Sequence, residues 1–109
     1  MNNYKLITIL NTKFKPIHFR LSGKAHYQIF LSIESTGNNS LNDVKRVEYY
    51  LHPSFKKRLR SSVNRSNNFR IEIKAWGVFD VKVTIFKNDG TKEEFTQSMK
   101  ENFKREAII

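Results

Sequence analysis

Apolar and polar residues alternate along much of the chain, and this alternation predicts short β-strands. The clearest example is the stretch "FRIEIKA", in which Phe69, Ile71, Ile73 and Ala75 share one face and charged residues occupy the other. A strand with one apolar and one polar face is typical of an antiparallel sheet that covers a core on one side. Three further stretches repeat the pattern, with the apolar faces Tyr27, Ile29, Leu31 and Ile33; Val47, Tyr49 and Leu51; and Phe79, Val81, Val83 and Ile85.

Turn residues separate these stretches. The segment "KNDGTK" (87–92) predicts a hairpin turn, because Asp-Gly supplies the positive-φ positions, and a short strand should follow over 91–96. The segments "YKLITIL" (4–10) and "KPIHFRL" (15–21) predict two more strands. The chain therefore has about seven or eight short strands with turns between them, which indicates an all-β fold, an antiparallel β-sandwich.

The remaining segments are polar or follow a different period. We expect loops at "STGNNSLND" (35–43) and "RSSVNRSNN" (60–68). In the tail, Met99, Phe103 and Ala107 recur every four residues, which predicts one or two turns of C-terminal helix. A length of 109 residues fits a single domain over 1–109.

Composition and charge narrow the choice of partners. The net charge of +10 should repel cationic peptides and attract nucleic acid, anionic surfaces or acidic proteins. No apolar run approaches the length that spans a bilayer, and "LITIL" (6–10) is too short for a signal-peptide core. We therefore expect a soluble, cytoplasmic monomer with no membrane partner.

Catalysis and metal binding have little support. The chain has no cysteine, and His18, His26 and His52 have no metal-ligand spacing among themselves or with carboxylates. No nucleophile elbow or glycine-rich phosphate loop is present. We expect no enzyme, no metal and no cofactor; His52 with Ser54 is the only pair worth a catalytic test.

A basic run supports a second kind of function. This basic patch could contact phosphates or could be a solvated loop, and the absence of interleaved aromatic residues favours the loop. Its members are Lys56, Lys57, Arg58, Arg60 and Arg65. The alternative function is a basic adaptor that binds nucleic acid or an acidic protein through the Lys56–Arg60 face.

Two motifs place aromatic residues at strand ends: "YLHPSF" (50–55) and "AWGVF" (75–79). Aromatic residues there can close the end of the core, as in a purely structural domain, or line a binding site. The neighbouring residues favour a site, because Ser54 offers a hydroxyl, His52 can orient it, and Gly77 permits an unusual backbone or close approach of a ligand.

The segments "VEYYLHPSF", "FRIEIKAWGVF" and "VKVTIFKNDGT" resemble the YEATS domain, closest to its prokaryotic branch, over about Ala25 to Thr96. The resemblance implies an immunoglobulin-like β-sandwich and a non-catalytic reader of acylated lysine, since eukaryotic members bind histone tails. This chain departs from the family at Ala75, where many members have Gly, and at Lys56-Lys57, where many have a Pro-rich turn.

The resemblance also implies an acyl-lysine site. Phe55 and Trp76 correspond to two aromatic residues that sandwich the acyl-lysine amide, and Phe79 to a further aromatic lining residue. Ser54 corresponds to the hydroxyl that bonds the amide, and His52 to the residue that orients it. The full implied set is His52, Ser54, Phe55, Trp76, Gly77 and Phe79. An acylated lysine is uncharged and flat, so it can stack between rings, and the basic charge favours an acylated or acidic protein or peptide as partner.

Overall fold

The computed structural model describes residues 3–15, 17–18, 25–37 and 41–108. These residues form nine strands and two short 3₁₀ turns, Leu41–Asp43 and Arg65–Asn67. The strands are β1 (Tyr4–Asn11), β2 (Ile17–His18), β3 (Ala25–Ser35), β4 (Val44–Tyr50), β5 (Leu59–Ser62), β6 (Ile71–Ala75), β7 (Asp80–Lys87), β8 (Lys92–Ser98) and β9 (Phe103–Glu106). Among the described residues, no helix is long and apolar enough to cross a membrane.

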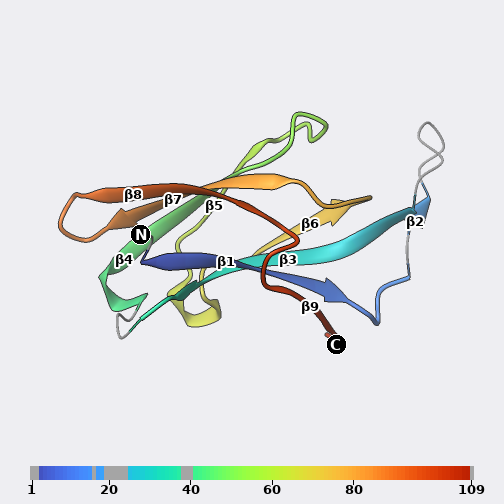
Figure 1. Cartoon of the computed structure of the whole chain (residues 1–109), viewed down its shortest axis with the longest axis horizontal. Coiled ribbons are helices and arrows are strands. Elements are labelled where there is room, and N and C mark those ends of the chain that lie inside the picture. Colours follow the sequence, from blue (N-terminus) through green and yellow to red (C-terminus); the bar gives the residue numbers. More distant parts are fainter. Residues whose placement is uncertain (1–2, 16, 19–24, 38–40, 109) are drawn as a thin grey trace.

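Two sheets pack face to face (Figure 1). The first has the order β2-β3-β1-β9, with β6 paired to β3 as well, and the second has the order β5-β4-β7-β8. All pairs are antiparallel except β1 with β9, which is parallel. The predicted all-β sandwich is therefore confirmed.

The core lies between the sheets and is built from the predicted alternating positions. Along β4 and β7 the apolar side chains on one face are fully buried, and Ile71, Ile73 and Ala75 are buried on β6. The predicted hairpin turn is also present: Gly90 has φ 87°, and the Lys87 N–H donates to the Thr91 carbonyl at 2.9 Å. A domain of this size can be stabilised by its hydrophobic core without disulfide bonds or metal ions.

Tyr49 connects the two sheets inside the core. Its ring is fully buried on β4, and its hydroxyl donates to the Phe69 carbonyl at 2.8 Å. Phe69 precedes β6 and, like Asn68, has a positive φ, so it does not begin the strand as the alternation predicted. Burial raises the pKa of the Tyr49 hydroxyl above its ordinary value.

The C-terminal helix predicted from the four-residue spacing is wrong. After β8, a turn leads into β9, which runs parallel to β1 with Thr8 opposite Phe103. Met99 is fully buried in the turn, whereas Ala107 is exposed. The segment completes the edge of the first sheet instead of folding on itself.

Two further differences concern loops and strands. The predicted loop at 60–68 begins with strand residues, because β5 (Leu59–Ser62) pairs with β4. Of the predicted strand at 15–21, residues 17–18 pair with β3, and Pro16 and residues 19–21 lie outside the described residues. In addition, Thr84 alternates with the apolar residues Val83 and Ile85 of β7 but is itself buried.

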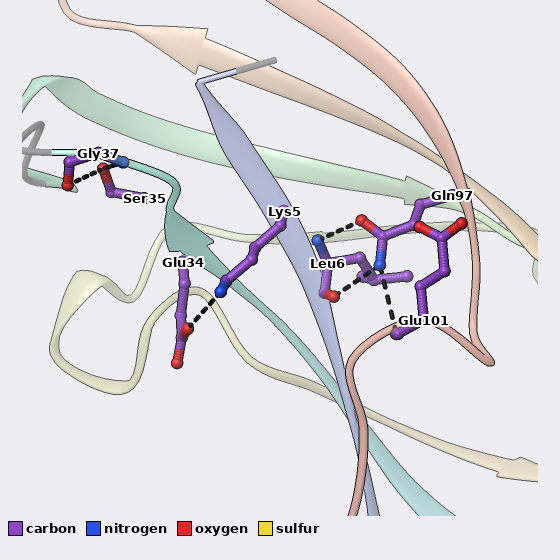
Figure 2. Close-up of polar contacts among 7 residues, drawn as sticks. All are labelled: Lys5, Leu6, Glu34, Ser35, Gly37, Gln97 and Glu101. Carbon is purple, nitrogen blue, oxygen red and sulfur yellow. Dashed lines mark hydrogen bonds and ion pairs between the residues drawn. The ribbon is translucent and has the colours of Figure 1, made fainter. Parts of the chain in front are cut away.

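Gln97 joins β8 of the second sheet to the edge of β1 (Figure 2). Its side-chain carbonyl accepts from the Leu6 N–H at 2.9 Å, and its amide nitrogen donates to the Leu6 carbonyl at 2.8 Å. A single side-chain amide thus replaces the backbone of a neighbouring strand at this position. β9 takes over that role from Thr8 onward, where its pairing with β1 begins.

Candidate functional site

The loop after β4 begins with a tight turn. The Phe55 N–H donates to the His52 carbonyl at 3.0 Å, which closes a turn over residues 52–55. Pro53 occupies the second position of this turn, where its fixed φ is favourable. Before the turn, Leu51 is buried and its N–H donates to the Arg58 carbonyl at 2.8 Å. The buried leucine and this hydrogen bond hold the turn at the end of the sandwich.

His52 and Ser54 are joined inside this turn. The backbone N–H of Ser54 donates to His52 Nδ1 at 3.1 Å, and Ser54 Oγ lies 2.9 Å from the same nitrogen. Because Nδ1 accepts from an N–H, it carries no proton, and the Ser54 hydroxyl must donate to it. The lone pairs of Ser54 Oγ are therefore left to accept a hydrogen bond from another group.

The loop between β6 and β7 presents Trp76. Its side chain is 47% exposed, while the preceding Ala75 is buried in the core. Together with the first loop it forms a shallow hollow of about 50 Å³, called here the loop hollow. The hollow is lined by His52, Trp76, Gly77, Val78 and Phe79.

Gly77 leaves space in this hollow. Its φ is not positive, so of the two roles that a glycine permits here the structure uses no unusual backbone conformation. A methyl group added at its Cα would meet no atom within 4 Å among the described residues, so close approach of a ligand remains open. Within the described part of the chain, the N–H groups of Gly77 and Val78 donate no hydrogen bond. Two backbone donors next to the exposed Trp76 are therefore without an acceptor among the described residues.

Phe55 and Phe79 support the hollow from the core side. Both are half-buried against the core, and their ring centroids lie 5.3 Å apart at 61°, an edge-to-face arrangement. Phe79 also lies 5.7 Å from the His52 ring. Neither Phe55 nor Ser54 lines the loop hollow: Phe55 packs against Phe79, and Ser54 is connected to the hollow through its contact with His52. Closure of the core thus accounts for Phe55 and Phe79 but not for Trp76.

The basic run does not gather into one patch. Lys56 and Lys57 are exposed in the first loop, whereas Arg65 follows β5, near the opposite end of β4, and donates to the Asn42 carbonyl at 3.2 Å. Two other arginines also bind backbone carbonyls: Arg58 Nε donates to Leu51 at 3.1 Å and Arg60 to Glu72 at 3.0 Å. The three arginines thus make contacts that stabilise the fold.

Val78 is the lining residue that the sequence did not single out, although it lies within the quoted "AWGVF" motif. Its exposure of 40% is unusual for valine and could have been suspected from its position between Gly77 and the strand start. Among the described residues, no three His, Asp or Glu side chains are placed to hold a metal ion.

Comparison with known proteins gives a family and a fold. A family model described as the prokaryotic YEATS domain matches residues 27–99. No curated protein sequence matches significantly. Among solved structures, the Yaf9 YEATS domain recognizing an H3K122suc peptide has a TM-score of 0.62 at 16% identity, covering 88% of this chain and 68% of that one.

Two further solved structures give the same fold. The yeast AF-9 homolog protein Yaf9 has a TM-score of 0.61 at 17% identity and covers 88% of this chain and 67% of that one. The Yaf9 YEATS domain bound to H3K27ac has the same TM-score and identity, with 88% and 68% covered. With two thirds of its residues matched by the family model and the two-sheet fold shared with these structures, the chain belongs to the prokaryotic YEATS-domain family.

Proposed function

We propose that the chain is a non-catalytic binding module that takes an acylated lysine, or a similar flat neutral amide, in the loop hollow. The observation that carries this proposal is the half-exposed Trp76 beside the joined His52–Ser54 pair. The family and the Yaf9 structures with H3K122suc and H3K27ac support it. An exposed indole ring beside hydrogen-bonding groups offers a flat apolar surface on which an amide can stack.

The polar groups match a secondary amide. The Ser54 oxygen can accept from the amide N–H, because its own proton is donated to His52. The amide carbonyl needs a donor, and the N–H groups of Gly77 and Val78 are available in the described structure. Leaving either amide group unpaired in a buried site would cost about 1–3 kcal/mol. A charged lysine has donors only, so a site that offers a donor as well as an acceptor favours an acylated lysine over a charged one.

The walls of the proposed site differ from those implied by the resemblance. Trp76 forms one wall, and His52 with Phe79 forms the other, while Phe55 holds Phe79 in position. The hollow has a volume of only about 50 Å³, so the proposed ligand group is small, an amide with a short acyl group. A longer acyl chain has to extend beyond the hollow.

Fluorescence of the single tryptophan tests this proposal. We expect a saturable change in Trp76 emission with acetyl- or crotonyl-lysine peptides and none with the unmodified peptide. By calorimetry, Ser54→Ala should weaken binding about tenfold, as expected for a lost hydrogen bond in a buried site. Trp76→Ala should abolish measurable binding, and Trp76→Phe should restore part of it. Ser61→Ala, an exposed serine on β5, serves as the matched control.

The same titrations address the basic adaptor. Binding of DNA or RNA through the Lys56–Arg60 face should fall steeply with salt and should be insensitive to Trp76→Ala. Three of the five arginines and lysines of that run already bind backbone carbonyls, so the contacts in the structure favour the acyl-lysine site. Acylated peptides that bind no better than the unmodified peptide would refute the proposal.

A further inference from the structure

A larger groove lies on the other side of the loop that carries Trp76. It has a volume of about 410 Å³ and shares Trp76, Gly77 and Val78 with the loop hollow. Its lining is mainly apolar: Leu10, Tyr27, Ile29, Ala75, Trp76, Gly77, Val78, Phe103 and Arg105. We call it the sheet-end groove. The groove does not include His52 or Phe79, so it differs from the proposed amide site, with which it shares the wall formed by residues 76–78.

The groove arises because the first sheet is longer than the second. In Figure 1, β3 continues toward β2 beyond the point where β8 turns toward β9. The inner face of the first sheet is core elsewhere, since Leu6, Leu31 and Ile33 on that face are fully buried. At the far end the same face continues with Leu10 opposite Ile29, and the sheet-end groove opens beside this pair in the described part of the chain.

Some of the apolar side chains that line the groove are exposed, although Ile29 and Ala75 are buried. Tyr27 is 37% exposed and Val78 40% exposed, and both lie beside the half-exposed Trp76. Exposed apolar side chains grouped around a groove in this way can form an interaction site.

Positively charged side chains next to the groove indicate what kind of partner it can bind. Arg105 lies at the rim, with its guanidinium carbon 5.4 Å from the Phe103 ring centroid. An adjoining hollow of about 290 Å³ adds Lys100 and shares Val78, Phe103 and Arg105. Among the described residues that line the two spaces, there are two cations and no carboxylate. A partner that fits must therefore combine an apolar group with a nearby negative charge.

The neighbouring strand favours an extended peptide. β9 is the last strand of its sheet, and its pairing partner β1 lies on one side only. The backbone of an edge strand can bind an additional strand. Phe103 and Arg105 are two residues apart, so they lie on the same face of β9, opposite Thr8 and Leu10 of β1.

We propose that the sheet-end groove binds an extended acidic segment of a partner protein. The segment inserts a bulky apolar side chain between Tyr27, Trp76 and Phe103, and it places an Asp or Glu, two residues away, against Lys100 and Arg105. Two residues of a strand span about 7 Å on one face, the repeat of Phe103 and Arg105 themselves. This site requires no acylated lysine.

Short peptides test the site directly. A peptide with the spacing Phe-x-Glu and no lysine is titrated into the isotopically labelled protein, and amide shifts are followed by NMR. We expect saturable shifts at Tyr27, Trp76 and β9. Replacing Phe by Ala, or Glu by Lys, should each weaken binding roughly tenfold or more, since each removes one of the two contacts.

Protein variants distinguish binding in this groove from binding elsewhere on the surface. Arg105→Glu should weaken binding roughly tenfold, whereas Lys45→Glu, the same change of charge at an exposed position on β4, should weaken it less than twofold. His52→Ala should leave the affinity unchanged, which distinguishes this site from the loop hollow. Arg105→Gln provides a milder second variant, and thermal unfolding checks that each variant is folded.

Several outcomes would overturn the proposal. Equal losses for Arg105→Glu and Lys45→Glu would mean that only the overall charge attracts the peptide. Equal binding of the Phe and Ala peptides, or no binding at millimolar concentration, would exclude insertion into the groove. A concentration-dependent dimer that blocks the shifts would show that a second copy of the chain occupies this face instead.

Discussion

Removing the hydroxyl of Tyr49 should weaken the connection between the two sheets. In Tyr49→Phe the buried carbonyl of Phe69 loses the hydrogen bond of 2.8 Å that it receives from the hydroxyl. An unsatisfied buried carbonyl costs about 1–3 kcal/mol, and the ring itself is retained, so we expect a loss of about 2 kcal/mol in the free energy of unfolding at pH 7. The carbonyl belongs to a residue with positive φ, so the turn at Asn68 and Phe69 should also loosen.

The stability difference between the wild type and Tyr49→Phe should also depend on pH, which gives a second quantity to measure. Burial raises the pKa of the Tyr49 hydroxyl in the folded state above its ordinary value of 10.0. The stabilisation by the neutral hydroxyl is therefore fully present below pH 10 and declines as pH rises above it, because the unfolded chain can then ionise. At pH 11 the difference between wild type and Tyr49→Phe should be smaller by about 1.4 kcal/mol than at pH 7.

Urea unfolding followed by circular dichroism measures both quantities. Tyr50→Phe is the matched control, because Tyr50 is the next residue on β4 and its side chain is 43% exposed. Its substitution should change the free energy of unfolding by less than about 0.5 kcal/mol. A loss below about 0.5 kcal/mol for Tyr49→Phe at pH 7, or an equal loss at pH 7 and pH 11, would refute the reasoning.

Three further predictions concern stability and use the same urea assay. Gln97→Leu should lower the free energy of unfolding by about 2 kcal/mol, because the Leu6 N–H and carbonyl both lose their partner. The Gln97→Glu variant should be less stable at pH 7 than at pH 4, since its carboxylate would face the Leu6 carbonyl. Thr8→Val should raise the free energy of unfolding by about 1 kcal/mol, because the buried hydroxyl has no hydrogen-bond partner among the described residues. A lower free energy of unfolding in this variant would show that the hydroxyl does have a hydrogen-bond partner. Gly90→Ala should lower the free energy of unfolding by about 1 kcal/mol, because Gly90 has φ 87°, where a side chain causes strain. An unchanged urea midpoint would contradict this prediction.

Alternation predicted most of the fold because it reports directly on which side of a strand is buried. The tail shows the limit of that signal. A spacing of four residues fits one helical face, but four is also twice the strand period, so Met99 and Phe103 could not decide between the two. The deciding factor was the free edge of β1, which pairs with Phe103–Glu106 and lies about ninety residues earlier in the chain. Such long-range pairing leaves no local pattern.

The candidate site was predictable to the extent that it is local. The contact between His52 and Ser54 forms within one turn, so the motif itself indicated it. The position of Phe55 behind Phe79 depends on packing between two loops, and it could not be read from either motif alone. Likewise, Arg58 and Arg60 have the composition of a phosphate site, but their hydrogen bonds to backbone carbonyls appear only in the folded chain.

The pairing of Gln97 with Leu6 also bears on how the protein is made. The two residues are 91 positions apart, and β9 pairs with the same strand from still later in the chain. At a synthesis rate of about 5–20 residues per second, β1 waits roughly 5–20 s for the residues that complete its edge. During that interval an apolar strand with unpaired backbone groups is open to strands of other nascent chains. Folding of this domain is therefore expected to finish only after β9 has been synthesised and can pair with β1.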